Sequence, residues 1–338
     1  MSTPTGLTRR ALLGGAVASA VAATAASASA QQLQNHLPPG MTPKAKGPHV
    51  FLDFDQTELD ASYDQALWAP NQTAIALRNA QKSAATIIRL GPPRRLAYGP
   101  TAIERLDLYP TKRPSAPVHV FVHGGAWRRG RSADAAYMAE TFVDAGAHFI
   151  AVDFQNVIDA GGNLMTMVDQ VRRAVAWVYT NAATFGGDRD RLYLSGASSG
   201  AHLASVVLTT DWQKEFGLPR ELVKGGMCCS GVYDLYPVSL SARRSYVTFG
   251  AATIAALSSQ RHLDTLAAPV IVAYGTLETP EFQRQNREFA AAVKAAGKPV
   301  TLLIGDGYNH FEMHETQGNP YGLLGRAALG QMKLGPPV

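Results

Sequence analysis

The chain has 338 residues, enough for one large α/β domain or two small ones, with 46% apolar and 17% charged residues. This composition excludes a collagenous, coiled-coil or largely disordered protein. The net charge of +5 comes without a cluster of Lys and Arg, so the charge pattern does not indicate nucleic acid binding.

Residues 1–30 are typical of an export signal. Residues 8–13 (Thr-Arg-Arg-Ala-Leu-Leu) open an apolar, Ala-rich stretch that ends in Ala28-Ser29-Ala30, the arrangement of a cleavable secretory signal. The paired arginines favour the twin-arginine route. A membrane anchor is the alternative, but the apolar run is short and precedes a cleavage-like site. We therefore expect a periplasmic or secreted protein without stable membrane insertion, and removal of Arg9 and Arg10 would lower the net charge to +3.

Residues 31–98 form the next predicted unit, a lead-in followed by a helical N-terminal or lid segment. The lead-in at residues 31–48 is polar and rich in Pro and Gly, which is typical of a loose segment. Residues 56–92 have helical spacing of apolar side chains, interrupted by residues 68–71 (Trp-Ala-Pro-Asn).

Residues 99–338 are predicted to form one α/β catalytic domain. Short apolar, β-branched strands are expected at 118–122, 148–154, 192–194, 226–229, 270–274 and 300–304. Helical stretches such as 167–179 lie between them, and this alternation predicts a mostly parallel sheet with helices on both faces. The long connection at 235–268 is expected to contribute to a small lid. The adjacent Cys228 and Cys229 are expected to be buried free thiols, because a bridge between neighbours would be strained.

A candidate nucleophile follows the third of these strands. Residues 196–200 (Gly-Ala-Ser-Ser-Gly) form a G-x-S-x-G motif between strand 192–195 and a helical run that starts at Ala201. This strand–turn–helix context is the one a nucleophile elbow requires, and the tight turn demands glycines where side chains would collide with neighbouring elements. Ser198 is therefore the predicted nucleophile. A purely structural turn is the alternative for this motif alone.

A second strand end supplies the predicted oxyanion donors. Residues 123–127 (His-Gly-Gly-Ala-Trp) match the H-G-G-G type of loop, whose backbone N–H groups stabilise the charge of a tetrahedral intermediate. The loop positions Gly124, Gly125 and Ala126, together with Ser199, are the predicted oxyanion hole, since only main-chain groups are needed. His123 is expected to hold the loop in place. A glycine loop used only for packing is the alternative.

His310 is the predicted base among the nine histidines. It follows the last strand, where the order Ser, acid, His places the base, and a neutral imidazole is needed to take the serine proton. His314 is the weaker rival, and His202 is expected to point away from the elbow. The spacing of His310 and His314 also permits a helical pair of metal ligands, but the order is not H-E-x-x-H and no third ligand is evident. We therefore expect neither metal nor cofactor.

Three carboxylates compete for the role of orienting the imidazole. Glu278 lies nearest the end of strand 270–274 and is the first choice, with Glu281 as its competitor. Asp234, after the preceding strand, is the third option and is more easily interpreted as a helix cap.

Taken together, these motifs resemble the kynurenine formamidase (arylformamidase) branch of the α/β-hydrolases, which also contains carboxylesterases of the H-G-G-x-W type. The resemblance runs from about Asp53 to the C-terminus and implies triad roles for Ser198, Glu278 and His310. It also implies that residues 53–71 fold over the site. Glu278 stands where many relatives have Asp, and Ser199 stands where Ala is common, but neither change removes the chemistry.

The predicted function is hydrolysis of a small carboxylic ester through an acyl-enzyme, with arylformamidase or aryl-amidase activity as the alternative. An export signal favours an esterase, because tryptophan breakdown is cytoplasmic. A non-catalytic binding protein on a hydrolase scaffold is the alternative from another class. Trp127, Tyr63 and Trp68 are candidate walls of the substrate pocket, although core packing is the simpler interpretation of each. The sequence leaves the substrate and the oligomeric state open, a homodimer included.

Overall fold

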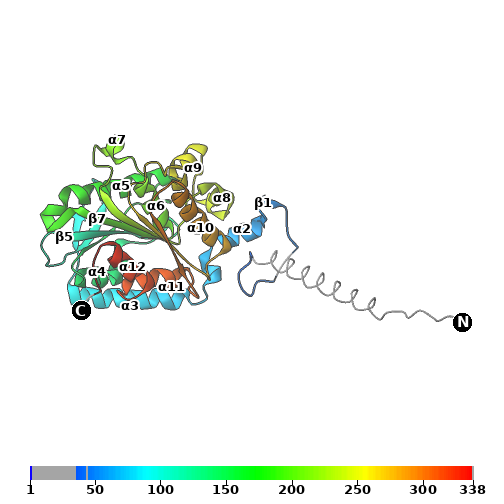
Figure 1. Cartoon of the computed structure of the whole chain (residues 1–338), viewed down its shortest axis with the longest axis horizontal. Helices are drawn as coiled ribbons and strands as arrows, with labels where there is room; N and C mark the ends of the chain where they lie inside the picture. The colour runs from blue at the N-terminus through cyan, green and yellow to red at the C-terminus, as the bar shows by residue number, and fades with distance from the viewer. Residues whose placement is uncertain (2–35, 43–44, 337–338) are drawn as a thin grey trace.

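The computed structural model describes Met1, residues 36–42 and residues 45–336 (Figure 1). Apart from Met1, the predicted export signal at residues 1–30 lies outside the described residues. Along the described chain, no helix combines the length and the hydropathy needed to span a bilayer.

The strands form an eight-stranded sheet and a separate two-stranded ribbon. They are β1 (His49–Phe51), β2 (Phe54–Asp55), β3 (Arg94–Ala97), β4 (Arg105–Tyr109), β5 (Ala116–Val122), β6 (His148–Val152), β7 (Gly187–Ala197), β8 (Val223–Cys229), β9 (Val270–Gly275) and β10 (Val300–Gly305). The large sheet has the order β10-β9-β8-β7-β5-β6-β4-β3. All neighbours from β10 to β6 pair in parallel, whereas β4 pairs antiparallel with both β6 and β3. The predicted mostly parallel sheet is confirmed, and β3 and β4 extend it beyond the expected strands.

Helices cover both faces of this sheet. The α-helices are α2 (Gln56–Ser62), α3 (Gln72–Leu90), α4 (Ala139–Asp144), α5 (Leu164–Asn181), α6 (Ser199–Leu208), α7 (Trp212–Phe216), α8 (Leu235–Leu240), α9 (Ala251–Leu257), α10 (Pro280–Ala295), α11 (His310–Glu315) and α12 (Leu323–Gln331). The short 3₁₀ helices are η1 (Gln65–Trp68), η2 (Ser132–Met138), η3 (Ala182–Phe185), η4 (Ala242–Ser245), η5 (Ser259–Arg261) and η6 (Thr316–Gly318). In Figure 1, α5, α6 and α10 lie on one side of the sheet, and α3, α4, α11 and α12 lie on the other.

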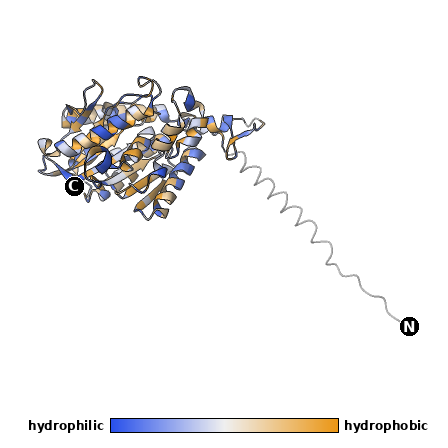
Figure 2. Ribbon diagram, turned by 90° about the horizontal axis from the view of Figure 1, so that it is seen from above, coloured by the Kyte–Doolittle hydropathy of each residue, from blue (hydrophilic) through white to orange (hydrophobic). Residues whose placement is uncertain are grey.

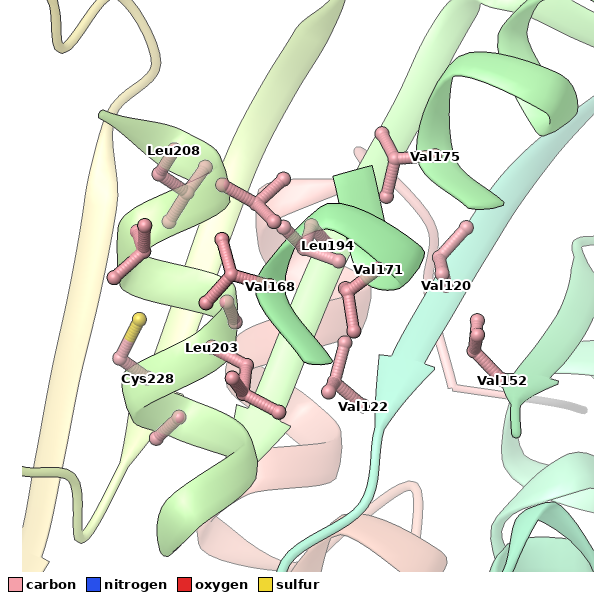
Figure 3. Packing of buried hydrophobic residues seen from close by; sticks show 14 of the residues in the cluster. Val120, Val122, Val152, Val168, Val171, Val175, Leu194, Leu203, Leu208 and Cys228 are labelled. Carbon is pink, nitrogen blue, oxygen red and sulfur yellow. The ribbon is translucent and has the colours of Figure 1, made fainter. Parts of the chain in front are cut away.

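The central strands are hydrophobic along their whole length because neither face meets water. Every residue of β5 and β6 is buried, and these strands carry mostly apolar residues. Figure 2, coloured by hydropathy, shows both apolar (orange) and polar (blue) residues on the helices around the sheet. Two separate hydrophobic clusters result, one on each face of the sheet. Figure 3 shows the first, in which valines of α5 and leucines of α6 pack on β5, β7 and β8. Cys228 joins this cluster as a free, buried thiol, and Cys229 is also free and buried, as predicted.

The N-terminal segment follows the predicted helical pattern. The helical run breaks around residues 68–71, where η1 ends and α3 begins one residue after Asn71. The predicted lid connection at 235–268 contains α8, η4, α9 and η5. Residues from each of these two segments line the cavity described below.

Candidate active site

Ser198 occupies a strained turn between β7 and α6. Its backbone angles are φ 57° and ψ −126°, a conformation that costs a residue with a side chain about 1–3 kcal/mol. The Ser198 N–H donates to the carbonyl of Cys229 at 2.9 Å, which fixes the turn against the neighbouring strand β8. The side chain is thereby presented at the carboxyl edge of the sheet, where the loops after β5, β9 and β10 also arrive.

The second glycine of the motif is required by a close approach. A β-carbon at Gly200 would lie 2.2 Å from the carbonyl oxygen of Val122 at the end of β5. Only glycine therefore lets α6 start this close to the sheet, which is the reason the motif was expected to end in glycine.

The imidazole of His310 lies between the serine and a carboxylate. His310 Nε2 is 2.9 Å from Ser198 Oγ, and His310 Nδ1 is 2.8 Å from Glu278 Oε2. All three side chains are buried, so the two hydrogen bonds are screened little by water. With Nδ1–H donating to Glu278, Nε2 is left as the acceptor for the serine proton.

Glu278 is held rigidly by donors on its far oxygen. The Ser230 hydroxyl and the Gly275 N–H each donate to Glu278 Oε1 at 2.7 Å. Burying a carboxylate is costly unless its oxygens are hydrogen-bonded, and here both oxygens have partners. Ser230 follows the end of β8 at the same edge of the sheet, and the sequence analysis did not identify it.

The two rival carboxylates serve other purposes. Glu281 accepts from the Tyr63 hydroxyl at 2.8 Å and forms an ion pair with Arg284 at 2.6 Å. Asp234 is the N-cap of α8 and accepts from the Tyr236 N–H at 3.1 Å. Neither carboxylate forms a hydrogen bond or an ion pair with His310, and Glu278 is the carboxylate in contact with the imidazole.

The loop after β5 lies directly against the serine turn. A β-carbon at Gly124 would fall 3.0 Å from Ser198 Cβ, which shows how close the two segments come. Among the described residues, the N–H groups of Gly125, Ala126 and Ser199 have no protein acceptor, and the same is true of Gly124. Unpaired donors beside a nucleophile are available to a negatively charged oxygen, as an oxyanion hole requires.

Two side chains hold this loop in place. Ser199 Oγ accepts from the backbone N–H of Trp127 at 3.1 Å, which links the loop to the start of α6. His123 Nδ1 bonds the carbonyl of Gly124 at 2.9 Å, and its ring stacks on Phe154 with centroids 4.3 Å apart. The loop-holding role expected of His123 agrees with this geometry.

A cavity of about 1250 Å³ opens above Ser198 and His310. Its walls come from α2, η1, α3, the loop after β5, η2 and η4, so the N-terminal segment and the lid connection both cover it. Tyr63 lines this cavity, as expected. Trp127 and Trp68 do not line it, and their assignment as pocket walls is wrong.

The two tryptophans turn elsewhere for local reasons. Trp127 has a φ of 62°, which directs its indole into the core, where the ring packs edge-on against His202 at 5.3 Å. Trp68 donates its indole N–H to the carbonyl of Ala61 at 3.1 Å and so fastens η1 to α2. Both tryptophans therefore have a packing role, which the sequence analysis gave as the simpler interpretation.

The other buried histidines near the site stay neutral. Burial lowers the pKa of His202 to about 4, and its Nε2 bonds the Leu257 carbonyl at 2.9 Å, away from the elbow. Burial, followed by the charge of His310, holds the pKa of His314 well below its ordinary value. The His314 ring lies 4.5 Å from the His310 ring, but it makes no hydrogen bond to Ser198. Within the described residues, no group of three or more His, Cys, Asp and Glu is arranged to hold a metal ion.

Sequence comparison finds relatives that are hydrolases. Residues 106–240 match the BD-FAE family model. The chain is 30% identical over 278 residues to kynurenine formamidase of Danio rerio, an alignment that covers 78% of this chain and 91% of the relative. It is also 27% identical to isoprenylcysteine alpha-carbonyl methylesterase of Arabidopsis thaliana, over 65% of this chain and 56% of the relative.

Solved structures share the fold. A Silicibacter sp. TM1040 structure assigned as a thioesterase has a TM-score of 0.70 at 20% identity and covers 80% of this chain and 98% of its own. Esterase LipW of Mycobacterium marinum has a TM-score of 0.58 at 18% identity, over 80% of this chain and 91% of its own. At these identities the likeness concerns the fold alone, a mostly parallel sheet with helices on both faces.

Proposed function

Because the chain belongs to the α/β-hydrolase family that includes the kynurenine formamidases, and is therefore a hydrolase of ester or amide bonds, we propose that it is a serine carboxylesterase. Its substrate would be a small carboxylic ester, cleaved through an acyl-enzyme on Ser198. The observation that carries this proposal is the hydrogen-bonded series Ser198–His310–Glu278 beside unpaired backbone N–H groups.

Acylation follows from the geometry of these groups. Ser198 Oγ attacks the ester carbonyl while His310 Nε2 takes its proton, and Glu278 holds and stabilises the imidazolium. The carbonyl oxygen becomes negatively charged and binds the N–H groups of Gly125, Ala126 and Ser199. Oxyanion donors act on the transition state alone, and losing one costs about 10²–10³ in rate.

The intermediate then collapses, and His310 returns the proton to the departing alcohol. In deacylation, water attacks the acyl-enzyme, His310 takes a proton from that water, and Ser198 is regenerated as the carboxylic acid leaves. One water is consumed, and one acid and one alcohol are formed.

Arylformamidase or aryl-amidase activity is the second candidate, favoured by the 30% identity to kynurenine formamidase over 91% of that relative. The same groups would cleave a formyl amide, with an aryl amine as the leaving group. The preference for an ester over an amide substrate, as distinct from serine hydrolysis itself, rests on the predicted export of the chain, since an exported enzyme meets incoming molecules rather than a cytoplasmic pathway.

The test compares kcat/KM for 4-nitrophenyl acetate, formanilide and N-formylkynurenine. An esterase turns over the acetate far faster than either amide, and a formamidase reverses that order. Ser198→Ala should remove nearly all activity on the better substrate, and full activity in that variant would overturn the proposal.

Export is a separate part of the proposal. It is supported by the paired arginines at positions 9 and 10 and by the small residues before Gln31. Expression of the full chain in a bacterium, followed by fractionation and mass spectrometry, should give a periplasmic or secreted protein that begins at Gln31. Replacing both arginines by lysine should retain the chain in the cytoplasm, and unchanged export would contradict the twin-arginine route.

A further inference from the structure

Arg243 is a buried cation that has no acidic partner within ion-pair distance. It lies in η4 with 7% of its surface exposed and lines the cavity that contains Ser198. Its Nη2 donates to the Tyr63 carbonyl at 3.0 Å, and among the described residues no carboxylate lies within 4.0 Å of the guanidinium. Burial lowers the pKa of this guanidinium, although not enough to remove its charge.

Most other charged groups that are buried among the described residues are ion-paired, and Asp55, which is not, accepts from the backbone N–H groups of Gly47 and Glu58. Glu281 is completely buried and bound to Arg284, and Glu104, 1% exposed, is bound to Arg173 at 2.6 Å. Arg243 departs from this pattern at the wall of the candidate active site.

Aromatic rings hold the Arg243 guanidinium close to the reacting groups. Its central carbon lies 5.1 Å from the Trp127 ring, 5.6 Å from the Tyr63 ring and 5.9 Å from the Phe282 ring. The Phe282 ring is in turn 5.3 Å from the ring of His310. The base and the guanidinium therefore lie against the same aromatic side chain, and both residues line the cavity.

A second buried polar side chain faces the same cavity without a partner. Gln65 is 6% exposed, and neither its amide nitrogen nor its amide oxygen has a protein partner. It lines the cavity two residues after Tyr63, the residue whose carbonyl accepts from Arg243. An unsatisfied buried amide costs about 1–3 kcal/mol, which a bound group can recover.

Charged groups of both signs surround Arg243 at this end of the cavity. Arg128, an exposed residue, lines the cavity, and its guanidinium lies 4.3 Å from the ring of Tyr246, which also lines it. Asp64 is the acidic group that acts on Arg243, and one of its oxygens caps η1 by accepting from the Ala66 N–H at 3.1 Å. An anion entering this end meets these two cations, and it also meets the carboxylates of Asp64 and of Asp60, which accepts from the Ala242 N–H beside Arg243.

We propose that Arg243 and Gln65 form a subsite that binds a carboxylate carried by the substrate itself. The natural substrate class is then an ester or amide with a free carboxylate a few bonds from the scissile carbonyl. The guanidinium offers two parallel N–H donors to such a group, and Gln65 offers one more. This inference rests on the proposed function, because it concerns the substrate of that same site.

Matched pairs of substrates test the subsite with the anion on either side of the scissile bond. On the acyl side, 4-nitrophenyl hemiadipate is compared with 4-nitrophenyl hexanoate. On the leaving-group side, 4-acetoxybenzoate is compared with its methyl ester, following acetate release. Wild-type protein that hydrolyses none of the four refutes the proposed function, whereas activity without preference for either anion overturns the subsite alone.

Arg243→Met should lower kcat/KM for the preferred anionic substrate by about 10- to 100-fold, the size of a charge-assisted hydrogen bond, and change the neutral partner by less than about threefold. Arg243→Lys should retain part of the preference. Gln65→Met should lower kcat/KM by a smaller factor, and only for the anionic substrate. Arg244→Met is the matched control, because this neighbouring arginine is exposed and does not line the cavity. An equal loss on both members of a pair would show a structural role and overturn the subsite.

Inhibition of the wild-type protein keeps the proposal testable if Arg243→Met does not fold. Benzoate should inhibit hydrolysis of the neutral esters competitively, and benzamide, which has the same shape without the charge, should inhibit at least tenfold less. Equal inhibition by the two would contradict the subsite.

Discussion

Replacing Glu278 by Gln should abolish most activity without disturbing the fold. Glu278 Oε1 accepts from Ser230 and from the Gly275 N–H, each at 2.7 Å, so the amide oxygen of the glutamine will occupy that position. Its NH₂ group will then face His310 Nδ1, which can only accept from it. The imidazole proton therefore moves to Nε2, the atom that must accept from Ser198.

A wrong tautomer of this kind costs about 10⁴ in kcat, equivalent to about 5.4 kcal/mol of transition-state stabilisation. The assay is steady-state hydrolysis of 4-nitrophenyl acetate, with thermal unfolding to confirm that the variant is folded. Glu281→Gln is the matched control, since Glu281 is also buried but pairs with Arg284. That control should lose about 3 kcal/mol of stability and keep most of its kcat. Wild-type kcat in Glu278→Gln, or a larger loss of kcat in Glu281→Gln, would refute the reasoning.

Further predictions concern the oxyanion loop and the buried histidines. Ser199→Ala removes the acceptor of the Trp127 N–H and should lower kcat. It should also lower the free energy of unfolding, measured in urea, by about 1–3 kcal/mol. An unchanged free energy of unfolding would contradict this prediction. Burial lowers the pKa of His119 to about 3 and that of His202 to about 4, so between pH 6.5 and 4 the unfolded chain binds protons that the folded chain does not. The free energy of unfolding should therefore fall as pH falls, by about 1.4 kcal/mol per pH unit for each histidine. Urea unfolding at pH 7, 5.5 and 4.5 measures this effect. The free energy of unfolding of His119→Gln should change less with pH than that of the wild-type protein. An equal change in the two proteins would contradict a lowered pKa of His119.

The central strands could be predicted because burial on both faces leaves a direct mark on the sequence. β5 and β6 are continuous apolar runs, and their positions agree with the expected ranges. β3 was missed because it lies at the sheet edge, where exposed residues such as Arg94 and Arg95 replace the apolar pattern. β4 was missed although it is mostly buried, because Arg105 and Asp107 interrupt its short apolar run.

The nucleophile and its base could be placed because each follows a strand end in a motif tied to backbone geometry. The choice between Glu278 and Glu281 could not be fixed in the same way, because both follow β9 within six residues and their directions depend on where α10 begins. The helix starts at Pro280, which turns Glu281 toward Arg284 three residues later.

The pocket walls depend on tertiary contacts that leave no sequence pattern. Trp127 follows the oxyanion loop, yet its positive φ turns the indole into the core. Arg243 lies in a connection with no motif, and only the fold brings it to the cavity with Gln65. Among the described residues, Arg243 stands out only because it has no acidic partner, and Gln65 because its buried amide has no protein partner. Both are properties of the folded structure that the sequence does not show.

Covalent labelling with a fluorophosphonate tests most directly whether Ser198, His310 and Glu278 act as one unit. The reagent reacts with a serine only when a base activates it, and peptide mass spectrometry identifies the modified residue. We predict one adduct per chain, on Ser198, and a labelling rate at least about 10³ lower in His310→Ala. An adduct on another serine, or equal labelling rates in the two proteins, would contradict the account.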